Sequence, residues 1–256
     1  MGSEANALAQ KWFRRFKPVD RPTLRLVCFP HAGGAASAFR SWPDRVPADV
    51  EVLAVRYPGR QDRFLEDCVD AMDELAGAIT AALEPYVAQP LAFFGHSMGA
   101  SVAYEVAART WRAHGRGPVR LFVSSQTAPH RMRDRFAHLM DDEALVEEVR
   151  RLGGVDGEAL ADPDVRELVL PAIRADFKLS SGYRPEAPER LDMPVVAYVG
   201  EKDPDVTATD LAAWADVSGA GFRRHVFPGD HFYLVTEESA LVADVVDHLG
   251  LPQLRR

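Results

Sequence analysis

Short, mostly apolar runs alternate along the chain with segments in which apolar residues recur every three or four positions. The runs predict strands, because they are short and are bounded by turn residues. They cover residues 24–29, 50–55, 91–94, 119–124, 194–199 and 222–227. Helices are predicted over residues 70–86, 100–109 and 237–249. This alternation is typical of an α/β fold with a mostly parallel central sheet and helices on both faces.

A Gly95-x-Ser97-x-Gly99 motif lies between the strand at residues 91–94 and the helix at residues 100–109. Strand, tight turn and helix in this order are the context of a nucleophile elbow, which lifts a serine hydroxyl above the sheet. Both glycines are expected there because a Cβ on either side of the turn would collide with backbone. A glycine-rich turn with an incidental serine is the alternative, and the flanking elements weigh against it. Ser97 is therefore the predicted nucleophile.

A serine of this kind needs a base to take its proton and an acid to hold the resulting imidazolium. In such folds the acid precedes the histidine along the chain. The strand at residues 194–199 ends in the loop 200–204 (GEKDP), at the edge where open α/β sheets carry catalytic groups. Asp203, which precedes a proline, is the predicted acid. Asp205 is the neighbour with which it could be confused, and a solvated acidic turn is the competing explanation for Glu201 and Asp205.

His231 is the predicted base. It follows the strand at residues 222–227 and a Pro-Gly-Asp turn, so that it lies on a loop beyond a strand end. A helix is then predicted to begin near Thr236, which would serve as its N-cap. A histidine on such a loop can turn toward the elbow.

The other histidines considered fit the role of base less well. His225 is inside a predicted strand and His248 inside the last helix, where packing or solvent contact explains them. His96 is adjacent to the predicted nucleophile, and the sharp turn is expected to direct it elsewhere. His130 and His138 lie in a charged segment with no strand end to present them.

Backbone amides must stabilise the oxyanion that develops on the attacked carbonyl. One is expected from Met98, the residue after the nucleophile. The strand at residues 24–29 is followed by residues 30–34 (PHAGG), which resemble the HGGG-type loop of esterases. The second donor is assigned to the Ala32 amide. A flexible Gly-Gly linker is the alternative, but it is not expected between a buried strand and the helix-like segment at residues 36–42.

The strand and helix alternation breaks between about residues 130 and 185. Two consecutive helices are predicted there, at residues 141–152 and 163–180, the second with Asp162 as N-cap, Pro163 at its first position and Pro171 where it can kink. Their insertion after the strand that follows the elbow helix favours a lid over the active site, with an ordinary helical excursion as the alternative.

At 256 residues, 47% of them hydrophobic, the chain can form one substantial core. We expect one α/β-hydrolase domain over residues 1–256, with a lid insertion at about 130–185.

Over nearly its whole length the chain resembles a type II thioesterase, the discrete editing hydrolase that accompanies polyketide synthases and nonribosomal peptide synthetases. The resemblance rests on several blocks in a fixed order: residues 29–34 with Phe39 and Trp42, 57–63, 94–100, 175–177 with Tyr183, and 229–232. It implies the α/β-hydrolase fold. It also implies the same site: Ser97, Asp203 and His231 as the catalytic triad, with Ala32 and Met98 as oxyanion donors.

The resemblance further implies a substrate and a partner. The acyl group is expected on the phosphopantetheine arm of an acyl or peptidyl carrier protein, and the task is the removal of stalled or wrongly primed short acyl groups. The residues alone indicate only an acyl hydrolase, so a general carboxylesterase or acyl-CoA thioesterase is one alternative. A chain-releasing or cyclising thioesterase, normally fused to a synthase, is another; the start at Met1 without a preceding carrier segment makes it less expected. A non-enzymatic receptor on this scaffold would need a broken triad position, and none is broken.

Composition narrows the setting. A net charge of −8 argues against nucleic acid as the main partner. No apolar run is long enough for a membrane span, and no signal peptide is evident, so a cytoplasmic enzyme is expected.

Cys28 and Cys68 fit a reducing compartment, and neither is expected to be bridged or catalytic. Neither a metal nor a cofactor is expected, because the chain has no spaced Cys/His cluster and no glycine-rich phosphate loop. Without heptads, a monomer is expected.

Two basic segments are candidates for docking a carrier protein. Carrier domains are acidic, so an acidic enzyme needs a local basic patch to meet one. Residues 130–135 (HRMRDR), at the start of the proposed lid, form one such patch, and Arg14, Arg15 and Lys17 form another. A solvated charged face is an equally good explanation of both.

Overall fold

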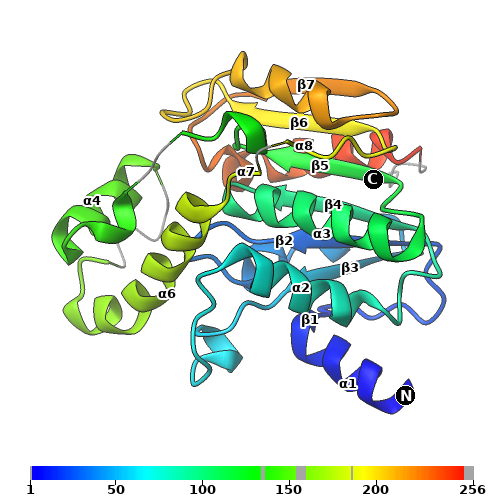
Figure 1. The fold of residues 1–256 in the computed structure, drawn as a ribbon, viewed down its shortest axis with the longest axis horizontal. Coiled ribbons are helices and arrows are strands. Elements are labelled where there is room, and N and C mark those ends of the chain that lie inside the picture. Colours follow the sequence, from blue (N-terminus) through cyan, green and yellow to red (C-terminus); the bar gives the residue numbers. More distant parts are fainter. Residues whose placement is uncertain (1, 134–135, 154–159, 186, 251–256) are drawn as a thin grey trace.

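The computed structural model describes residues 2–133, 136–153, 160–185 and 187–250. At its centre is a seven-stranded sheet in the order β1-β3-β2-β4-β5-β6-β7 (Figure 1). The strands are β1 (Phe13–Arg14), β2 (Leu24–Phe29), β3 (Val50–Val55), β4 (Leu91–His96), β5 (Arg120–Ser124), β6 (Val195–Gly200) and β7 (Phe222–Phe227). Only β1 is antiparallel to its neighbour β3; the other pairs are parallel. The predicted mostly parallel α/β sheet is confirmed.

Helices cover both faces of this sheet because its central strands are apolar on both sides. In β2, Val27 and Phe29 pack in one core cluster, and Leu26 and Cys28 pack in the other. The first cluster includes residues of α1 (Gly2–Trp12), α2 (Met72–Leu83), α3 (Met98–His114) and the 3₁₀ helix η6 (Asp210–Val217). The second includes residues of η1 (Ala36–Phe39), η2 (Trp42–Asp44), α7 (Tyr233–Thr236) and α8 (Glu238–His248).

The segment between β5 and β6 is helical, as the break in the alternation predicts. Its elements are η4 (Pro129–Arg131), η5 (Ala137–Leu139), α4 (Asp142–Arg151) and α6 (Pro163–Gly182), which lie to one side of the sheet in Figure 1. Asp162 caps α6 as expected, because its carboxylate accepts the Asp164 amide at 2.9 Å. Residues of η5, α4 and α6 share a small apolar cluster that also packs against Ala32 and Phe232. The insertion therefore touches the loops that carry the predicted site, while its role as a gate stays a prediction.

The structure differs from the predicted elements in several places. The hydrophobic pattern does not predict α1 or β1, and β1 is too short to show one; its Phe13 pairs with Val55 of β3. Thr236 does not cap the last helix, so that prediction is wrong: its hydroxyl donates to the Tyr233 carbonyl at 3.2 Å, and α8 begins at Glu238. The helix-like residues 36–42 form the separate turns η1 and η2. Helix α6 continues through Pro171.

None of the described helices is long and apolar enough to cross a lipid bilayer.

Candidate active site

Ser97 occupies a strained turn between β4 and α3. Its φ of 53° and ψ of −124° lie in a region that residues with a side chain rarely adopt. The turn is held from β5, because the Ser97 amide donates to the Ser124 carbonyl at 2.8 Å. A Cβ on Gly95 would collide with the Gly99 backbone, and a Cβ on Gly99 would collide with the Phe29 carbonyl. The close approach expected of a nucleophile elbow is therefore present around Ser97.

His231 and Asp203 form a buried pair beside this turn. His231 Nδ1 lies 2.8 Å from Asp203 Oδ2, and their side chains are 3% and 0% exposed. The other carboxylate oxygen of Asp203 accepts the amides of Asp205 and Val206 at 2.9 and 3.1 Å. Burial acts to raise the pKa of Asp203, but hydrogen bonding and attraction from His231, with the backbone donors, lower it overall. Asp205 is instead paired with Arg151 at 2.7 Å, so the structure brings Asp203 rather than its neighbour to His231.

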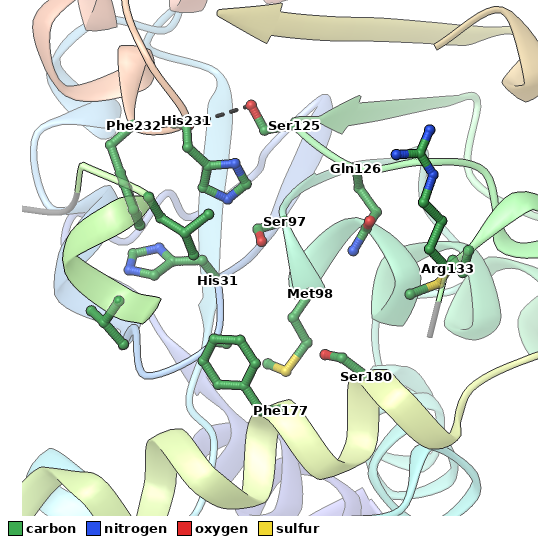
Figure 2. Close-up of a pocket in the computed structure, with 14 residues that line it drawn as sticks. His31, Ser97, Met98, Ser125, Gln126, Arg133, Phe177, Ser180, His231 and Phe232 are labelled. Carbon is green, nitrogen blue, oxygen red and sulfur yellow. Dashed lines mark hydrogen bonds between the residues drawn. The ribbon is translucent and has the colours of Figure 1, made fainter. Parts of the chain in front are cut away.

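The predicted site residues converge on one pocket. Ser97, Met98, Ala32 and His231 all line it, and Asp203 contacts His231. Figure 2 shows the Ser97 side chain and the His231 ring facing the same space, with Met98, Phe177 and Ser180 on its opposite side. The Nε2 atom of His231 is buried and has no hydrogen-bond partner among the described residues. This arrangement can move a proton from a serine hydroxyl to an imidazole, and the catalytic roles of these residues stay predictions.

Two further histidines lie beside His231. The pKa of His31 falls from 6.5 to about 3, first because of burial and then because of the charges of His231 and Arg60. His96 is fully buried, its Nδ1 lies 2.9 Å from the Ser124 hydroxyl, and burial lowers its pKa well below the usual value. Its ring centroid lies 5.2 Å from that of His231. Because both neighbours are neutral near pH 7, a proton on His231 meets no fixed positive charge from them.

The prediction that the turn directs His96 elsewhere needs a refinement. The structure packs His96 against His231, and His96 does not line the pocket itself. A hydrogen-bonded chain runs from His96 through Ser124 to the Tyr233 hydroxyl, with the last two 2.7 Å apart. Local pattern could not reveal this contact, because it joins β4, β5 and α7.

The loop at residues 30–34 contributes to the other side of the pocket. The Gly33 amide donates to Asp176 on α6 at 2.7 Å, and the Gly34 amide donates to the His31 carbonyl at 2.9 Å. No described residue accepts a hydrogen bond from the Ala32 amide. The Ala32 amide is therefore available to a ligand, as an oxyanion donor must be. Met98 begins α3, whose unpaired amides favour negative charge at the same place.

Within the described part of the chain, one group of side chains could hold a metal ion. His225, Asp244 and His248 place ligand atoms within 4.8 Å of one another. These groups already pair with each other and with Tyr198: Asp244 accepts the Tyr198 hydroxyl at 2.7 Å, and His248 Nδ1 lies 2.9 Å from the Asp244 carbonyl. None of them lines the pocket. The absence of a metal and of a cofactor from the chemistry stays a prediction.

The two basic segments differ in how far their charges are paired. Arg14, Arg15 and Lys17 each form an ion pair, with Asp62, Glu51 and Asp44 respectively. The segment at residues 130–135 is different. Arg131 forms no ion pair with a described residue, and Arg133 is 76% exposed and lies 3.5 Å from Asp210. Arg133 also lines the pocket. Asp134 and Arg135, which complete that segment, lie outside the described residues.

Comparison with known proteins assigns the chain to a family. A model of the thioesterase domain matches residues 24–249. The chain belongs to the thioesterase family. Thioesterase PikA5 of Streptomyces venezuelae is 42% identical to it, over 95% of this chain and 89% of that protein. The structure of BorB, a type II thioesterase from the borrelidin biosynthetic cluster, has a TM-score of 0.83 at 36% identity, covering 94% of this chain and 97% of BorB. That of RedJ, a thioesterase from the prodiginine pathway of Streptomyces coelicolor, has a TM-score of 0.82 at 39% identity, covering 90% of this chain and 88% of RedJ.

The resemblance to type II thioesterases and the α/β-hydrolase fold are thereby confirmed. This thioesterase carries a pocket that is lined by Ser97, His231, Ala32 and Met98, and thioester hydrolysis is the chemistry of its family. Arg60 and Asp176 are residues to which the sequence assigns no role, although both lie in blocks that carry the resemblance. Their contact joins segments far apart in the chain, so no local pattern could predict it.

Proposed function

We propose that this thioesterase hydrolyses short acyl groups from the phosphopantetheine arm of acyl or peptidyl carrier proteins. It would thereby remove stalled or aberrant acyl groups during polyketide or nonribosomal peptide biosynthesis. Support comes from its relatives: BorB belongs to the borrelidin biosynthetic cluster, and GrsT of Aneurinibacillus migulanus, 33% identical over 94% of each chain, is a gramicidin S biosynthesis protein. The enzyme is expected to act as a cytoplasmic monomer without a cofactor.

In the proposed mechanism Ser97 attacks the thioester carbonyl while His231 takes its proton. Asp203 accepts the Nδ1 hydrogen of His231, which leaves Nε2 to face the serine, and stabilises the imidazolium that forms. The amides of Ala32 and Met98 stabilise the tetrahedral oxyanion. Collapse of this intermediate breaks the carbon–sulfur bond and leaves an acyl-serine.

The thiolate leaves readily, because the pKa of a thiol, about 8.5, is far below that of an alcohol. It takes the proton from the His231 imidazolium, which restores the neutral base. His231 then takes a proton from water, the hydroxide attacks the acyl-serine, and the carboxylic acid is released while the proton returns to Ser97. Every proton in this cycle passes through His231 Nε2. The buried Nε2 without a described partner, in the pocket that Ser97 lines, is the observation that supports the proposed mechanism, while the relatives support the proposed substrate.

The test compares the same acetyl or propionyl group on a carrier protein, on coenzyme A and on an oxygen ester, with wild type and Ser97→Ala. We expect turnover that depends on Ser97 and is fastest on the carrier protein. Loss of the serine should lower kcat by about 10⁴-fold or more. Ester turnover as fast as carrier turnover would instead assign a general esterase, and turnover that survives in Ser97→Ala would remove the proposed mechanism.

A further inference from the structure

A buried ion pair joins the inserted helix α6 to the loop that follows β3. Arg60 Nη1 lies 2.5 Å from Asp176 Oδ2, and Arg60 Nη2 lies 2.9 Å from Asp176 Oδ1. The side chains of Arg60 and Asp176 are 10% and 2% exposed. A bidentate ion pair of this kind fixes both the distance and the orientation of its partners.

Both members of the pair also hold the loop at residues 30–34. Asp176 Oδ2 accepts the Gly33 amide at 2.7 Å, and Arg60 Nη1 donates to the Gly34 carbonyl at 3.2 Å. Tyr57, whose ring lies 5.3 Å from the Arg60 guanidinium, donates its hydroxyl to the Pro30 carbonyl at 3.2 Å. The loop is thus anchored before and after Ala32.

These anchors determine where the Ala32 amide points. That amide belongs to the peptide unit between His31 and Ala32. The preceding unit is held through the Pro30 carbonyl, and the following unit is held through the Gly33 amide. Because each peptide unit is planar, the middle unit has little freedom once its two neighbours are held.

We propose that Arg60 and Asp176 are positioning residues that orient the Ala32 amide as an oxyanion donor. Since Asp176 lies on α6, the geometry of the oxyanion hole depends on that helix being docked on the loop. This inference rests on the proposed function only through the role of Ala32. It does not depend on which thioester is the substrate.

A buried ion pair is a poor source of net stability, because desolvation offsets most of its attraction. An apolar pair of similar size can replace it with little loss of stability. Positioning and stability can therefore be separated by mutation. Asp176→Asn keeps the size of the side chain but removes its charge and replaces one carboxylate oxygen with an NH2 group. That group donates and cannot accept, so the two-point pairing with Arg60 is lost. Arg60→Met with Asp176→Leu removes the charges together.

The readout is the second-order rate at which a fluorophosphonate labels Ser97. In this reaction the serine oxygen bonds to phosphorus, the phosphorus–fluorine bond breaks, His231 takes the proton and fluoride leaves. The phosphoryl oxygen requires the oxyanion hole, whereas no carrier protein is needed. We expect labelling to slow by about tenfold or more in Asp176→Asn and in the double variant, with kcat for a small acyl thioester falling in parallel and KM within about threefold. The double variant should melt near the wild-type temperature.

Asp70→Asn is the matched control. Asp70 binds Lys178 on the same helix at 2.5 Å, but neither residue contacts the loop at residues 30–34. Its labelling rate should stay within about twofold of wild type.

Three results would overturn the inference: wild-type labelling rates in Asp176→Asn, recovery of the rate together with stability in the double variant, or an equal loss in Asp70→Asn. Failure of the proposed function is distinct. It would leave Ser97 labelled at the wild-type rate while the acyl carrier thioester is not hydrolysed.

Discussion

The pKa values of two histidines around the site are lowered mainly by burial and less by neighbouring charges. His96 is fully buried and His31 is partly buried beside His231, and loss of hydration is the main cause of their lowered pKa values. A neutral imidazole in such a place packs without an unpaired charge. Of the two described histidines that line the pocket, His31 and His231, it is His231 that has an acidic partner, because Asp203 lies 2.8 Å from its Nδ1.

The burial of His31 predicts a loss of stability in acid. The unfolded chain binds a proton at a pKa of about 6.5 and the folded protein only at about 3, so the free energy of unfolding falls as pH drops through this window. The drop amounts to on the order of 4 kcal/mol. His31→Gln should show a shallower fall when unfolding by urea is measured between pH 7 and pH 4. His225→Gln, whose side chain is partly exposed, serves as the control, and equal slopes in both variants would contradict the prediction.

Gly99→Ala tests the close packing of the elbow. The added Cβ would meet the Phe29 and Pro30 carbonyl oxygens, which are backbone atoms and cannot turn aside. We expect a loss of about 2 kcal/mol or more in unfolding free energy, together with a large loss of turnover. In Gly117→Ala the new Cβ would have its nearest neighbour at 3.5 Å, an ordinary contact, so this variant should resemble wild type. Calorimetry and a thioester assay decide between the two results.

At the scale of elements, α6 connects the insertion to the site. Phe177 lines the pocket and Asp176 holds the Gly33 amide, so the position of one helix affects both the pocket wall and the loop opposite. The apolar cluster of the insertion is small and is separate from the two layers that cover the sheet. Its helices therefore have fewer buried partners than α3, and they depend more on their caps.

Asp162→Ala should loosen the start of α6. Removal of the carboxylate leaves the Asp164 amide without its acceptor, at a cost of about 1 kcal/mol. The expected result is faster amide hydrogen exchange in the first turns of α6, with little change in the melting of the whole protein. Glu167→Ala changes an exposed residue of the same helix and should leave exchange unaltered. Unchanged exchange in Asp162→Ala would show that tertiary contacts alone hold this end of the helix.

At the scale of the whole molecule, charge is distributed unevenly on an acidic protein. Arg131 and Arg133 line a surface hollow with Asp210 and Asp216, and Arg133 reaches the pocket. Asp210 pairs with Arg133, and the Asp216 carboxylate lies 3.1 Å from His130 Nε2. Arg131 has no ion-pair partner in the described chain, so it is the cation of this hollow that we propose meets a carboxylate of an acidic partner.

Charge reversal at Arg131 and Arg133 should therefore raise KM for a carrier-bound thioester by about three- to tenfold and weaken its salt dependence. KM for a small thioester should stay the same, because no protein surface is docked. Lys17→Glu is the control, since Lys17 belongs to the segment whose charges are already paired. Steady-state kinetics at two ionic strengths give the answer, and equal effects on both substrates would remove the docking proposal.

Much of this architecture follows from local patterns. Short apolar runs bounded by turn residues predict the strands from β2 to β6, because a strand buried on both faces carries few polar residues. Strand β7 is predicted as well, although it is largely exposed and half of its residues are polar. The motif around Ser97 predicts a turn because only glycine tolerates the neighbouring backbone. Chain order, together with the loops that follow the strands at residues 194–199 and 222–227, selects Asp203 and His231 as candidates, with Asp205 as the neighbour of the acid.

Other features depend on contacts between distant segments, which no local pattern encodes. The choice of Asp203 over Asp205 is made by the packing of two loops, which brings one carboxylate to His231 and the other to Arg151. The contact of His96 with His231 and the pair of Arg60 with Asp176 join residues from different layers. Local sequence thus specified the elements and the kinds of reactive groups, while the three-dimensional packing selected their partners, because burial and distance exist only once the layers have come together.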